Sequence, residues 1–460
     1  MNQSFDSIVI GAGQAGPALA VRLAQSGRKT ALIERKLLGG TCVHVGCVPT
    51  KTLVASARVA HVARTAAAYG VDIQGDVAVN MVRVKARKDA VVQQSVQGLS
   101  QWLKTTPNLE VIEGHARFES SHSVRVNGQL LQAKEFFINV GGRASVPAMD
   151  GLADVDYLTN SSIMDLDVLP EHLLIIGGSY IGLEFAQIYR RFGSRVSVVE
   201  LGPRLIGRED GATSSAVQRI LEAEGVAIHL NANCLRVARV GNNIQLHVDC
   251  ESAPLQLSGS HLLLAVGRQP NTHDLGLAEA GVQVDARGYI GVDDQLRTNV
   301  EGIWAMGDAN GRGAFTHTAW NDYEIVAANL LDADPRRVSD RIAAYALFID
   351  PPLARVGLSE REVLASGVPA LVGRMKMTRV GRARERGETQ GFMSVLVHAQ
   401  TQQILGACLL GIEADEVIHT ILDVMAAKVP YTTLQRTMHI HPTVAELIPT
   451  LLADLRPLVP

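Results

Sequence analysis

The stretch DSIVIGAGQAGPALAVRLAQSGRKTALIE, residues 6–34, gives the clearest indication of the fold. It is typical of an apolar strand, a glycine-rich turn, a helix and a second strand that ends in an acid. In such a unit Gly11 allows the tight turn, Gly13 lets the backbone approach a pyrophosphate, and Gly16 lets the helix pack closely on the strand. The helix N-terminus attracts the phosphates, and Glu34 accepts hydrogen bonds from a ribose. The stretch therefore predicts a dinucleotide-binding unit.

A second copy of this pattern, HLLIIGGSYIGLEFAQIYRRFGSRVSVVE, occupies residues 172–200. The offset is 166 residues at each diagnostic position, pairing Gly11 with Gly177, Gly16 with Gly182 and Glu34 with Glu200. Ser179 stands where the middle glycine belongs, and because serine is small and its hydroxyl can bond a phosphate, we interpret it as a tolerated variant. Two copies in one register predict two dinucleotide sites in one polypeptide.

The bulk properties are those of an ordinary globular protein. The chain has 460 residues, 47% hydrophobic and 19% charged, which predicts two to four domains. A net charge of −3 gives no reason to expect nucleic acid or an anionic membrane as partner. The sequence contains no apolar run near the roughly 18 residues that span a bilayer, and its start has no basic region of a secretory signal. Five cysteines do not make a disulfide framework, so we expect a cytoplasmic protein.

The rest of the chain divides around the two copies. Residues 109–142 and 235–271 each alternate in the β manner and end in an apolar strand. From about Tyr345 the character changes: residues 379–411 are strand-like, and amphipathic helices are expected from Ala414 to Leu455. The predicted fold is α/β, with two Rossmann-like domains and a C-terminal α+β domain.

A cysteine pair lies in GGTCVHVGCVPTK, residues 39–51. Pro49 falls where a helix is expected to begin, so Cys47 lies near a helix N-terminus, where the dipole lowers a thiol pKa. A disulfide between Cys42 and Cys47 closes so short a loop that it is a poor staple. Redox chemistry explains the pair better.

Metal binding is the rival interpretation, because Cys42, His44 and Cys47 resemble part of a zinc ligand set. Structural zinc takes four ligands, commonly from paired knuckles, and Cys234, Cys250 and Cys408 form no second knuckle. Lys51 in the first helical turn also opposes a cation. We therefore expect no metal site, and expect His44 to tune the thiols.

The cysteine stretch resembles the redox-active motif of the class I pyridine nucleotide-disulfide oxidoreductases, which include dihydrolipoamide dehydrogenase, glutathione reductase and mercuric reductase. The resemblance runs from end to end. It implies an FAD site in copy one, a nicotinamide site in copy two, and a C-terminal dimerisation domain. TNVEGIWAMGDANG, residues 298–311, resembles the second FAD motif, and HIHPTVAELIP, residues 439–449, resembles the His-Pro motif. The implied domains are residues 1–150 (FAD, first part), 151–274 (NAD(P)), 275–344 (FAD, second part) and 345–460 (dimerisation).

The resemblance also implies residue roles. NAD(P)H would reduce FAD, which would reduce a Cys42–Cys47 disulfide. Cys47 would be the flavin-proximal thiol and Cys42 the interchange thiol. Lys51 would lie beside the flavin and pair with Glu184. His441, oriented by Glu446, would be the acid/base and would come from the partner subunit of a homodimer. The implied cofactor contacts are Gly11, Gly13, Gly16, Glu34, Thr41, Lys51, Ala116 and Asp308 for FAD, and Gly177, Ser179, Gly182, Glu200 and Gly267 for NAD(P)H.

The chain departs from the family pattern at several positions. His44 replaces the usual Asn between the cysteines, and INVGGRA, residues 138–144, replaces an Ala-Thr-Gly run. Glu200 favours NADH because an acid there bonds the 2′-hydroxyl and repels a 2′-phosphate. Arg204 and Arg208 follow closely and keep NADPH open.

The acceptor is the least determined feature. Mercuric reductases carry a C-terminal cysteine pair, whereas this chain ends LLADLRPLVP. Residues 314–331, 348–360 and 380–385 look like the mercuric-reductase-like branch that includes the reactive-chlorine-resistance oxidoreductase. Our hypothesis is a reductase of a disulfide, a metal ion or an oxidant-derived species. The alternatives are dihydrolipoamide dehydrogenase, mercuric reductase and a non-catalytic redox-sensing flavoprotein.

Overall fold

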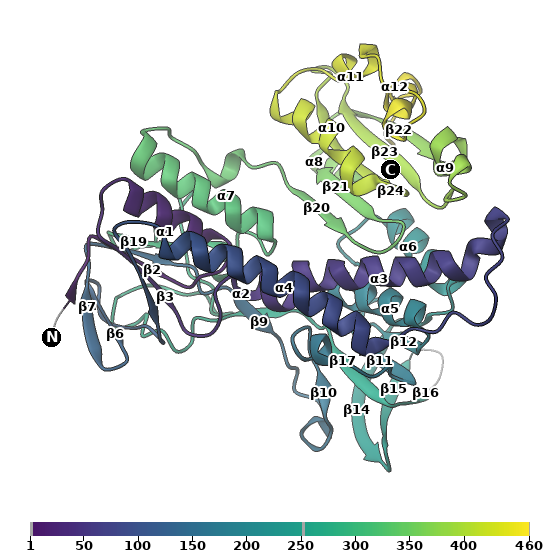
Figure 1. Cartoon of the computed structure of the whole chain (residues 1–460). Coiled ribbons are helices and arrows are strands. Elements are labelled where there is room, and N and C mark those ends of the chain that lie inside the picture. The colour runs from purple at the N-terminus through teal and green to yellow at the C-terminus, as the bar shows by residue number, and fades with distance from the viewer. Residues whose placement is uncertain (1–2, 251–253, 460) are drawn as a thin grey trace.

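The computed structural model describes residues 3–250 and 254–459. Two units with parallel sheets and a C-terminal unit with an antiparallel sheet make up the molecule (Figure 1). This confirms the fold class expected from the sequence. The domain boundaries at residues 150, 274 and 344 stay predictions, although the chain does return to the first sheet after it leaves the second unit.

The first unit is built on a parallel sheet with strand order β19-β8-β2-β3-β4. Its strands are β2 (Ser7–Ile10), β3 (Thr30–Glu34), β4 (Leu109–Glu113), β8 (Glu135–Ile138) and β19 (Ile303–Ala305). Helix α1 (Ala15–Gln25) connects β2 to β3. It is mostly buried, because its own side chains are apolar on nearly every face. A smaller sheet joins β1 (Gln3–Ser4), β5 (Arg117–Ser120), β6 (Ser123–Val126) and β7 (Gln129–Gln132).

The second unit has the strand order β10-β17-β11-β12-β13. These strands are β10 (Tyr157–Leu158), β11 (His172–Ile176), β12 (Arg195–Val199), β13 (Ala227–His229) and β17 (His261–Leu264). Helix α5 (Tyr180–Phe192) follows β11 and α6 (Gly211–Ala223) follows β12. An antiparallel meander consists of β14 (Ala232–Val240), β15 (Asn243–Cys250) and β16 (Pro254–Gly259), and a two-stranded pair joins β9 (Gly142–Ala144) to β18 (Arg268–Pro270).

The sequence repeat is also a structural repeat. The N–H of Gly11 donates to the carbonyl of Ile33 at 2.8 Å, and the N–H of Gly177 donates to that of Val199 at 2.8 Å. Gly11 and Gly177 have φ of 103° and 115°, in the left-handed region that disfavours side chains. Ser179 has φ of −113°, an extended conformation open to any residue, so the missing middle glycine costs the second turn no backbone strain.

The C-terminal unit is a six-stranded antiparallel sheet in the order β20-β21-β24-β23-β22-β25. Its strands are β20 (Ala344–Leu347), β21 (Leu353–Gly357), β22 (Ala370–Lys376), β23 (Phe392–His398), β24 (Ile404–Leu410) and β25 (Arg456–Pro457). The accompanying helices are α8 (Glu360–Ser366), α9 (Gly381–Glu385), α10 (Ala414–Ala426), α11 (Thr432–Arg436) and α12 (Ile448–Ala453).

Two details of this unit differ from the sequence prediction. Residues 379–391 are not strand throughout: α9 occupies part of them, and Gly387 and Gly391 adopt positive φ before β23 begins. The helical region from Ala414 to Leu455 is divided into separate helices, because Pro430 and Pro442 cannot continue a helix hydrogen-bond ladder.

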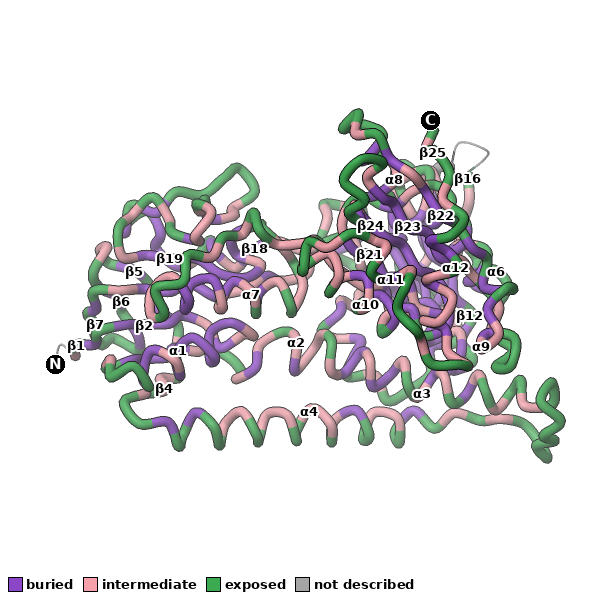
Figure 2. The backbone as a smooth tube through the Cα atoms, turned by 90° about the horizontal axis from the view of Figure 1, so that it is seen from above, coloured by how far each residue is buried: buried purple, intermediate pink, exposed green. Residues whose placement is uncertain are grey.

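Four further helices follow strands of the first unit. Helices α2 (Gly40–Val45), α3 (Cys47–Thr65) and α4 (Met81–Lys104) follow β3, and α7 (Thr316–Ala327) follows β19. Figure 2 shows that α4 lies along one edge of the molecule with much of its length exposed, and of its 24 residues only Met81, Lys88 and Leu103 are buried. Among the residues that the structure describes, no helix combines the length and apolar character needed to cross a bilayer.

Candidate active site

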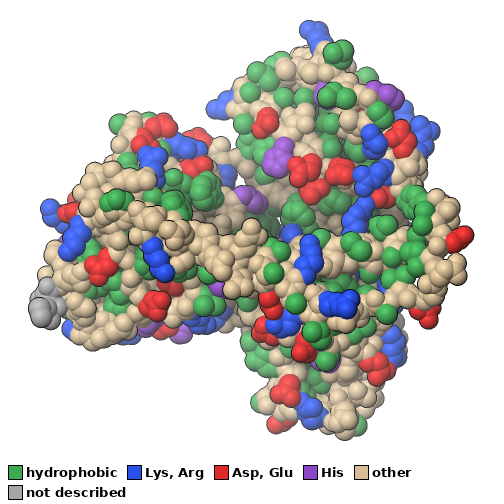
Figure 3. All heavy atoms as spheres, viewed as in Figure 1, with side chains coloured by type: hydrophobic (Ala, Val, Ile, Leu, Met, Phe, Trp, Pro, Cys, Tyr) green, Lys and Arg blue, Asp and Glu red, His purple; other side chains and the backbone are tan. Residues whose placement is uncertain are grey.

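One large cavity of about 2130 Å³ is lined by residues of all three units. Small-molecule sites in proteins usually measure about 300–1,000 Å³, so this cavity has room for more than one ligand. Its wall includes the glycine turns of both repeats. Figure 3 shows the face of the molecule hollowed between the first unit and the C-terminal unit. We call the cavity of about 2130 Å³ the main cavity.

The two cysteines that face the main cavity lie on consecutive helices. Cys42 is on α2, not in a loop, and Cys47 is the first residue of α3, so the helix expected to begin at Pro49 begins two residues earlier. Between them Gly46 passes so close to α2 that a Cβ there would lie 2.8 Å from the Thr41 carbonyl oxygen and 3.1 Å from the Cys42 Cα. The glycine lets the chain reverse tightly, which brings the two thiols together.

The pKa values of the two thiols are shifted in opposite directions. A hydrogen bond from the Cys42 thiol lowers the pKa of Cys47 to about 6, while burial acts in the opposite direction. The Thr316 hydroxyl, 3.1 Å from the Cys47 sulfur, and the charge of Lys51 lower that pKa further. The same bond to Cys47 raises the pKa of Cys42. Since the thiolate is the reactive form of cysteine, Cys47 carries the negative charge of the pair near neutral pH.

Lys51 lies one turn along α3 from Cys47 and bonds an acid from the second unit. Its ammonium donates to both carboxylate oxygens of Glu184, at 2.8 and 3.0 Å, and lies 4.5 Å from the centre of the Phe348 ring. Glu184 is on α5 and is mostly buried. It also accepts the backbone N–H of Phe348 at 3.0 Å. The pairing that the resemblance implied is present, and it joins three parts of the chain beside the thiols.

Glu34 and Glu200, the acids at the end of the second strand of each repeat, accept equivalent hydrogen bonds. Glu34 accepts the backbone N–H groups of Ala12 and Lys36, each at 2.8 Å. Glu200 accepts those of Gly178 and Gly202, at 2.6 and 2.7 Å. Each carboxylate is therefore held against its glycine turn at the strand end, where an adenosine ribose is expected.

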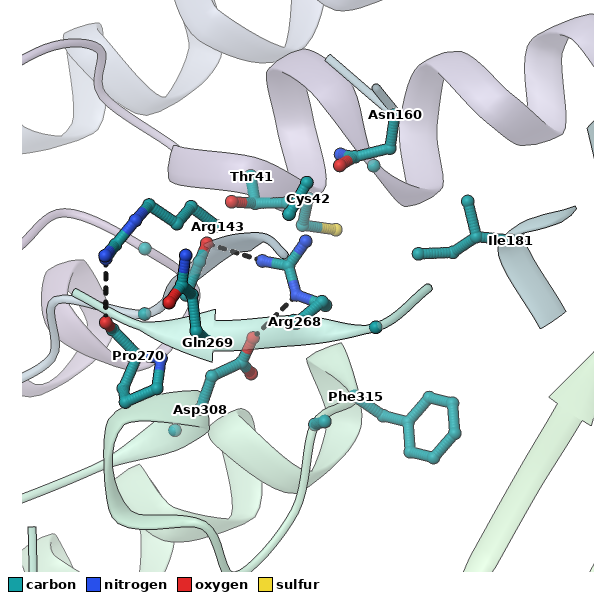
Figure 4. A pocket seen from close by; sticks show the side chains of 18 of the residues that line it. Thr41, Cys42, Arg143, Asn160, Ile181, Arg268, Gln269, Pro270, Asp308 and Phe315 are labelled. Atoms are coloured by element: carbon teal, nitrogen blue, oxygen red, sulfur yellow. Dashed lines mark hydrogen bonds and ion pairs between the residues drawn. The ribbon is translucent and has the colours of Figure 1, made fainter. Parts of the chain in front are cut away.

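Asp308 lies in a short 3₁₀ turn, Gly307–Asn310, at the end of β19. Burial raises the pKa of this carboxyl, and the guanidinium of Arg268, 3.4 Å away, opposes the effect. In Figure 4 the side chains of Asp308 and Arg268 point toward one another. Arg268 also donates to the carbonyl of Gly142 at 2.6 Å.

Most of the predicted site residues line the main cavity. From the expected FAD set these are Gly11, Gly13, Glu34, Thr41, Ala116 and Asp308. From the expected nicotinamide set they are Gly177, Ser179, Glu200 and Gly267. From the expected catalytic set they are Cys42, Cys47, Lys51 and Glu184. Gly16 and Gly182 do not line it: a Cβ on either would lie 2.0 Å from the carbonyl oxygen of Gly11 or Gly177, so these glycines allow the helices to pack on the strands.

His441 and Glu446 lie elsewhere in the same chain. The His441 Nδ1 is 2.8 Å from the Glu446 carboxylate, and the His441 side chain is 80% exposed. Neither residue lines the main cavity of its own chain. The sequence pairing is therefore present, but a single chain does not bring it to its own thiols.

His44 bonds the backbone and not a thiol. Its Nε2 lies 2.8 Å from the carbonyl oxygen of Leu38, a contact that closes the turn before α2. Within residues 3–250 and 254–459, no group of three or more His, Cys, Asp and Glu side chains is arranged to hold a metal ion.

Sequence reasoning missed several residues that shape the site. Thr316, the first residue of α7, bonds the Cys47 sulfur from 269 positions away. Asp322 is buried on α7 and accepts from the Gly307 N–H at 2.8 Å and the Asn310 amide at 2.9 Å, which fixes the turn that carries Asp308. Asn139 donates to the Gly11 carbonyl at 3.2 Å, in the segment where the family run is replaced. Among these residues only Asp322 could have been noticed in the sequence, because it is an acid at helical spacing from the apolar residues Ala319 and Val326.

The residues of the first repeat fit FAD. A Cβ at Gly11 would lie 2.3 Å from the Asn139 carbonyl oxygen, and one at Gly40 would lie 2.9 Å from the Gly13 Cα, so this wall is kept free of side chains for a pyrophosphate. The partly buried Asp308 carboxyl supplies a hydrogen-bonding group further along the same cavity. Two dinucleotide turns that share one cavity with a polarised dithiol define a flavoprotein disulfide reductase.

The comparisons with known proteins identify the family. The model for pyridine nucleotide-disulphide oxidoreductases matches residues 5–322, and the model for the dimerisation domain of that family matches residues 343–452. The chain belongs to the pyridine nucleotide-disulphide oxidoreductase family. It therefore binds FAD, takes electrons from NAD(P)H and carries the domain through which family members form homodimers.

Similar proteins cover nearly the whole chain. The probable pyridine nucleotide-disulfide oxidoreductase RclA of Escherichia coli is 37% identical over 450 residues, 96% of this chain and 97% of the relative. A mercuric reductase of Streptomyces lividans is 32% identical over 96% of this chain and 94% of the relative. The solved structure of the HOCl-induced flavoprotein disulfide reductase RclA from Escherichia coli matches with a TM-score of 0.89 and 36% identity, over 98% of this chain and 99% of that one. A Cu(II) complex of the same protein matches equally well.

Proposed function

We propose that this protein is an NADH-dependent flavoprotein reductase whose Cys42–Cys47 dithiol delivers electrons to Cu(II) or to a disulfide formed by oxidants. The observation that carries the proposal is the lowered pKa of Cys47 in a cavity shared with both dinucleotide turns. The Cu(II) complex of the similar RclA supports a metal-ion acceptor. Because the reaction consumes cellular reduced nicotinamide, we place the protein in the cytoplasm.

Residues of this chain stabilise the Cys47 thiolate and control the protonation of Cys42. FAD, when bound, supplies the two-electron link between NAD(P)H and the Cys42–Cys47 disulfide. Lys51, held by Glu184, keeps a positive charge one helical turn from Cys47. The Thr316 hydroxyl and the N-termini of α3 and α7 stabilise the Cys47 thiolate after the disulfide opens. Cys42, whose pKa is raised, retains its proton until a base removes it.

We propose that the base is His441 of the partner subunit, oriented by that subunit's own Glu446. In a single chain the His441 side chain is 80% exposed, and its neighbours Met438 and Ile440 are 95% and 81% exposed. Apolar side chains so exposed around a histidine are typical of a segment that inserts into another surface. Proton removal from Cys42 would then make it the attacking thiolate.

The electrons balance for either acceptor. With a disulfide, the Cys42 thiolate attacks one sulfur and expels the other as a thiolate, which takes up a proton. Cys47 then attacks Cys42 and releases the second thiol. With copper, oxidation of the dithiol to the disulfide yields two electrons and two protons, and two Cu(II) ions become two Cu(I).

We propose NADH as the preferred donor. The Glu200 carboxylate is fixed at the end of β12 by two backbone bonds, so it cannot easily turn away from a ribose. An acid held there bonds a 2′-hydroxyl and repels a 2′-phosphate. Arg208 also lines the cavity and is the group that would favour NADPH.

The test is a set of turnover assays on the FAD-loaded protein. We would measure NADH and NADPH oxidation with Cu(II), Hg(II), oxidised glutathione and lipoamide, with Cys42→Ser as the control for dithiol dependence. We expect Cu(II) or a disulfide other than lipoamide to give the highest kcat/KM, lost at least tenfold in Cys42→Ser. Fast turnover of lipoamide alone would assign a dihydrolipoyl dehydrogenase, the activity of relatives 31% identical over 97% of this chain. Acceptor reduction unaffected by Cys42→Ser would refute the dithiol route.

A further inference from the structure

A second cavity of about 640 Å³ lies between α6 and the six-stranded sheet, away from the dithiol. Its α6 wall includes Thr213, Ala216, Arg219 and Ile220, which follow one another at helical spacing. The hydroxyl of Thr213 lies 3.6 Å from the sulfur of Cys408 on β24, so the two walls meet at the base of the cavity. Its volume is within the range of about 300–1,000 Å³ typical of small-molecule sites.

On the sheet wall of this cavity, four residues on adjacent strands form a row. Strand register places Arg355 beside Cys408, Cys408 beside Ser394, and Ser394 beside Arg374. Arg355 is 4% exposed, yet it lines the cavity. Two of its guanidinium nitrogens bond Glu209 and Asp210, at 2.8 and 2.9 Å. Its third nitrogen has no hydrogen-bond acceptor among the residues that the structure describes.

The charges around the cavity leave an excess of cations. The lining contains four cations, Arg219, Arg355, Arg374 and Lys376, against two acids, Asp210 and Glu360. Glu209 lies behind Arg355 and lowers the excess to one positive charge. Arg374 is paired with Glu360 at 2.6 Å. Within the described part of the chain, Arg219 and Lys376 have no carboxylate within ion-pair distance, and both are exposed at the cavity.

The remaining lining is apolar. Ala216, Ile220 and Leu396 are each less than a tenth exposed, and Phe392 is partly buried. The thiol of Cys408 adds no charge, because burial raises its pKa to about 12. An occupant that matches both parts of the lining has an apolar body and a single negative group.

We propose that this cavity is a second ligand site that binds a small organic anion with an apolar body, such as a medium-chain carboxylate. The anionic group lies between Arg219 and Lys376, and the apolar body lies against α6 and β23. This site is separate from the reductase reaction, and its binding is measured without turnover.

Calorimetric titration of the FAD-loaded protein with octanoate, with the nicotinamide site saturated by NAD⁺, tests the proposal. We expect one octanoate per chain, and a dissociation constant at least fivefold higher in the double variant Arg219→Gln/Lys376→Gln. Arg195→Gln, which removes an exposed cation elsewhere on the second unit, should bind as the wild type does. Octylamine, of the same length but opposite charge, should not compete.

A second variant protects the test from a folding defect. Ala216→Leu narrows the cavity without changing charge, and we expect it to lower octanoate affinity while flavin absorbance and the KM for NADH stay unchanged. Absence of saturable octanoate binding to the wild type would overturn the proposal. So would a change of less than fivefold in the double variant.

Discussion

The hydroxyl of Thr316 lies 3.1 Å from the sulfur of Cys47, although 269 residues separate them in the chain. Thr316 is the first residue of α7 and Cys47 is the first residue of α3, so the N-termini of two helices meet at one sulfur. The partial positive charge at a helix N-terminus stabilises a thiolate. The position of α7 thus adds to an acidity that the sequence around Cys47 already favours.

Replacing Thr316 by valine should raise the pKa of Cys47 from about 6. Cys47 is a thiolate above its pKa and a thiol below it, so the loss of a donor moves the transition to higher pH. The pH profile of iodoacetamide alkylation of the reduced protein, quantified on the Cys47 peptide by mass spectrometry, measures this shift. Thr316→Ser keeps the hydroxyl and should restore the profile. A valine variant with the wild-type profile would show that the hydroxyl does not act on the thiol.

Mixing two inactive variants should recover activity if His441 acts across subunits. A Cys42→Ser homodimer has no interchange thiol, and a His441→Gln homodimer has no base at either site. In a heterodimer one of the two sites combines an intact cysteine pair with an intact His441. Random reassociation of equal amounts makes about half of the dimers heterodimers, so we expect about a quarter of wild-type turnover. Activity no greater than that of the separate variants after verified subunit exchange would place His441 outside the partner's site.

Replacing His44 by asparagine should leave FAD bound but change the dithiol potential. The imidazole bonds the Leu38 carbonyl and closes the turn that leads into α2, which carries Cys42. A shorter side chain holds that turn less firmly, so the geometry of the cysteine pair changes. Flavin absorbance reports cofactor binding, and equilibration with glutathione buffers reports the potential. A wild-type potential would assign His44 no influence on the thiols, and loss of a stoichiometric metal would show that it is a ligand.

Glu209 should be important for stability. It is fully buried, accepts the Tyr345 hydroxyl at 2.6 Å and pairs with the buried Arg355. Removing one partner of a buried ion pair typically costs about 3–5 kcal/mol. We expect Glu209→Ala to lower the free energy of unfolding by an amount in this range, measured by urea denaturation. Glu360→Ala removes an exposed pairing with Arg374 and serves as the control, with an expected loss of about 0–1 kcal/mol. Equal losses in the two variants would contradict the role of burial.

Tyr345 shows what Glu209 holds in place. Its ring stacks on Phe315 with centroids 5.8 Å apart and meets Tyr180 edge-on at 5.7 Å. All three rings line the main cavity, and Phe315 directly precedes Thr316. The buried acid of the second unit is therefore connected through a strand of the C-terminal unit to the N-terminus of α7.

The features that depend on local chain geometry could be predicted from the amino-acid sequence. The turn at Gly11 and its copy at Gly177 require positive φ, and the acids Glu34 and Glu200 end the following strands, so both dinucleotide units are encoded within about 30 residues each. The short spacing of Cys42 and Cys47 likewise limits where the two thiols can lie. These features are predictable because neighbours in sequence are neighbours in space.

Contacts that depend on how the elements pack became visible only in the folded molecule. The Thr316–Cys47 bond spans 269 residues of chain within the first unit, and Asp322 supports the Asp308 turn from the helix that follows it. The link from Glu209 to Tyr345 joins the second unit to the C-terminal unit. No periodicity or motif specifies them, because each depends on how helices and sheets pack against one another. His441 marks the limit of a single chain: its pairing with Glu446 is local, whereas its exposure follows from where the C-terminal unit lies.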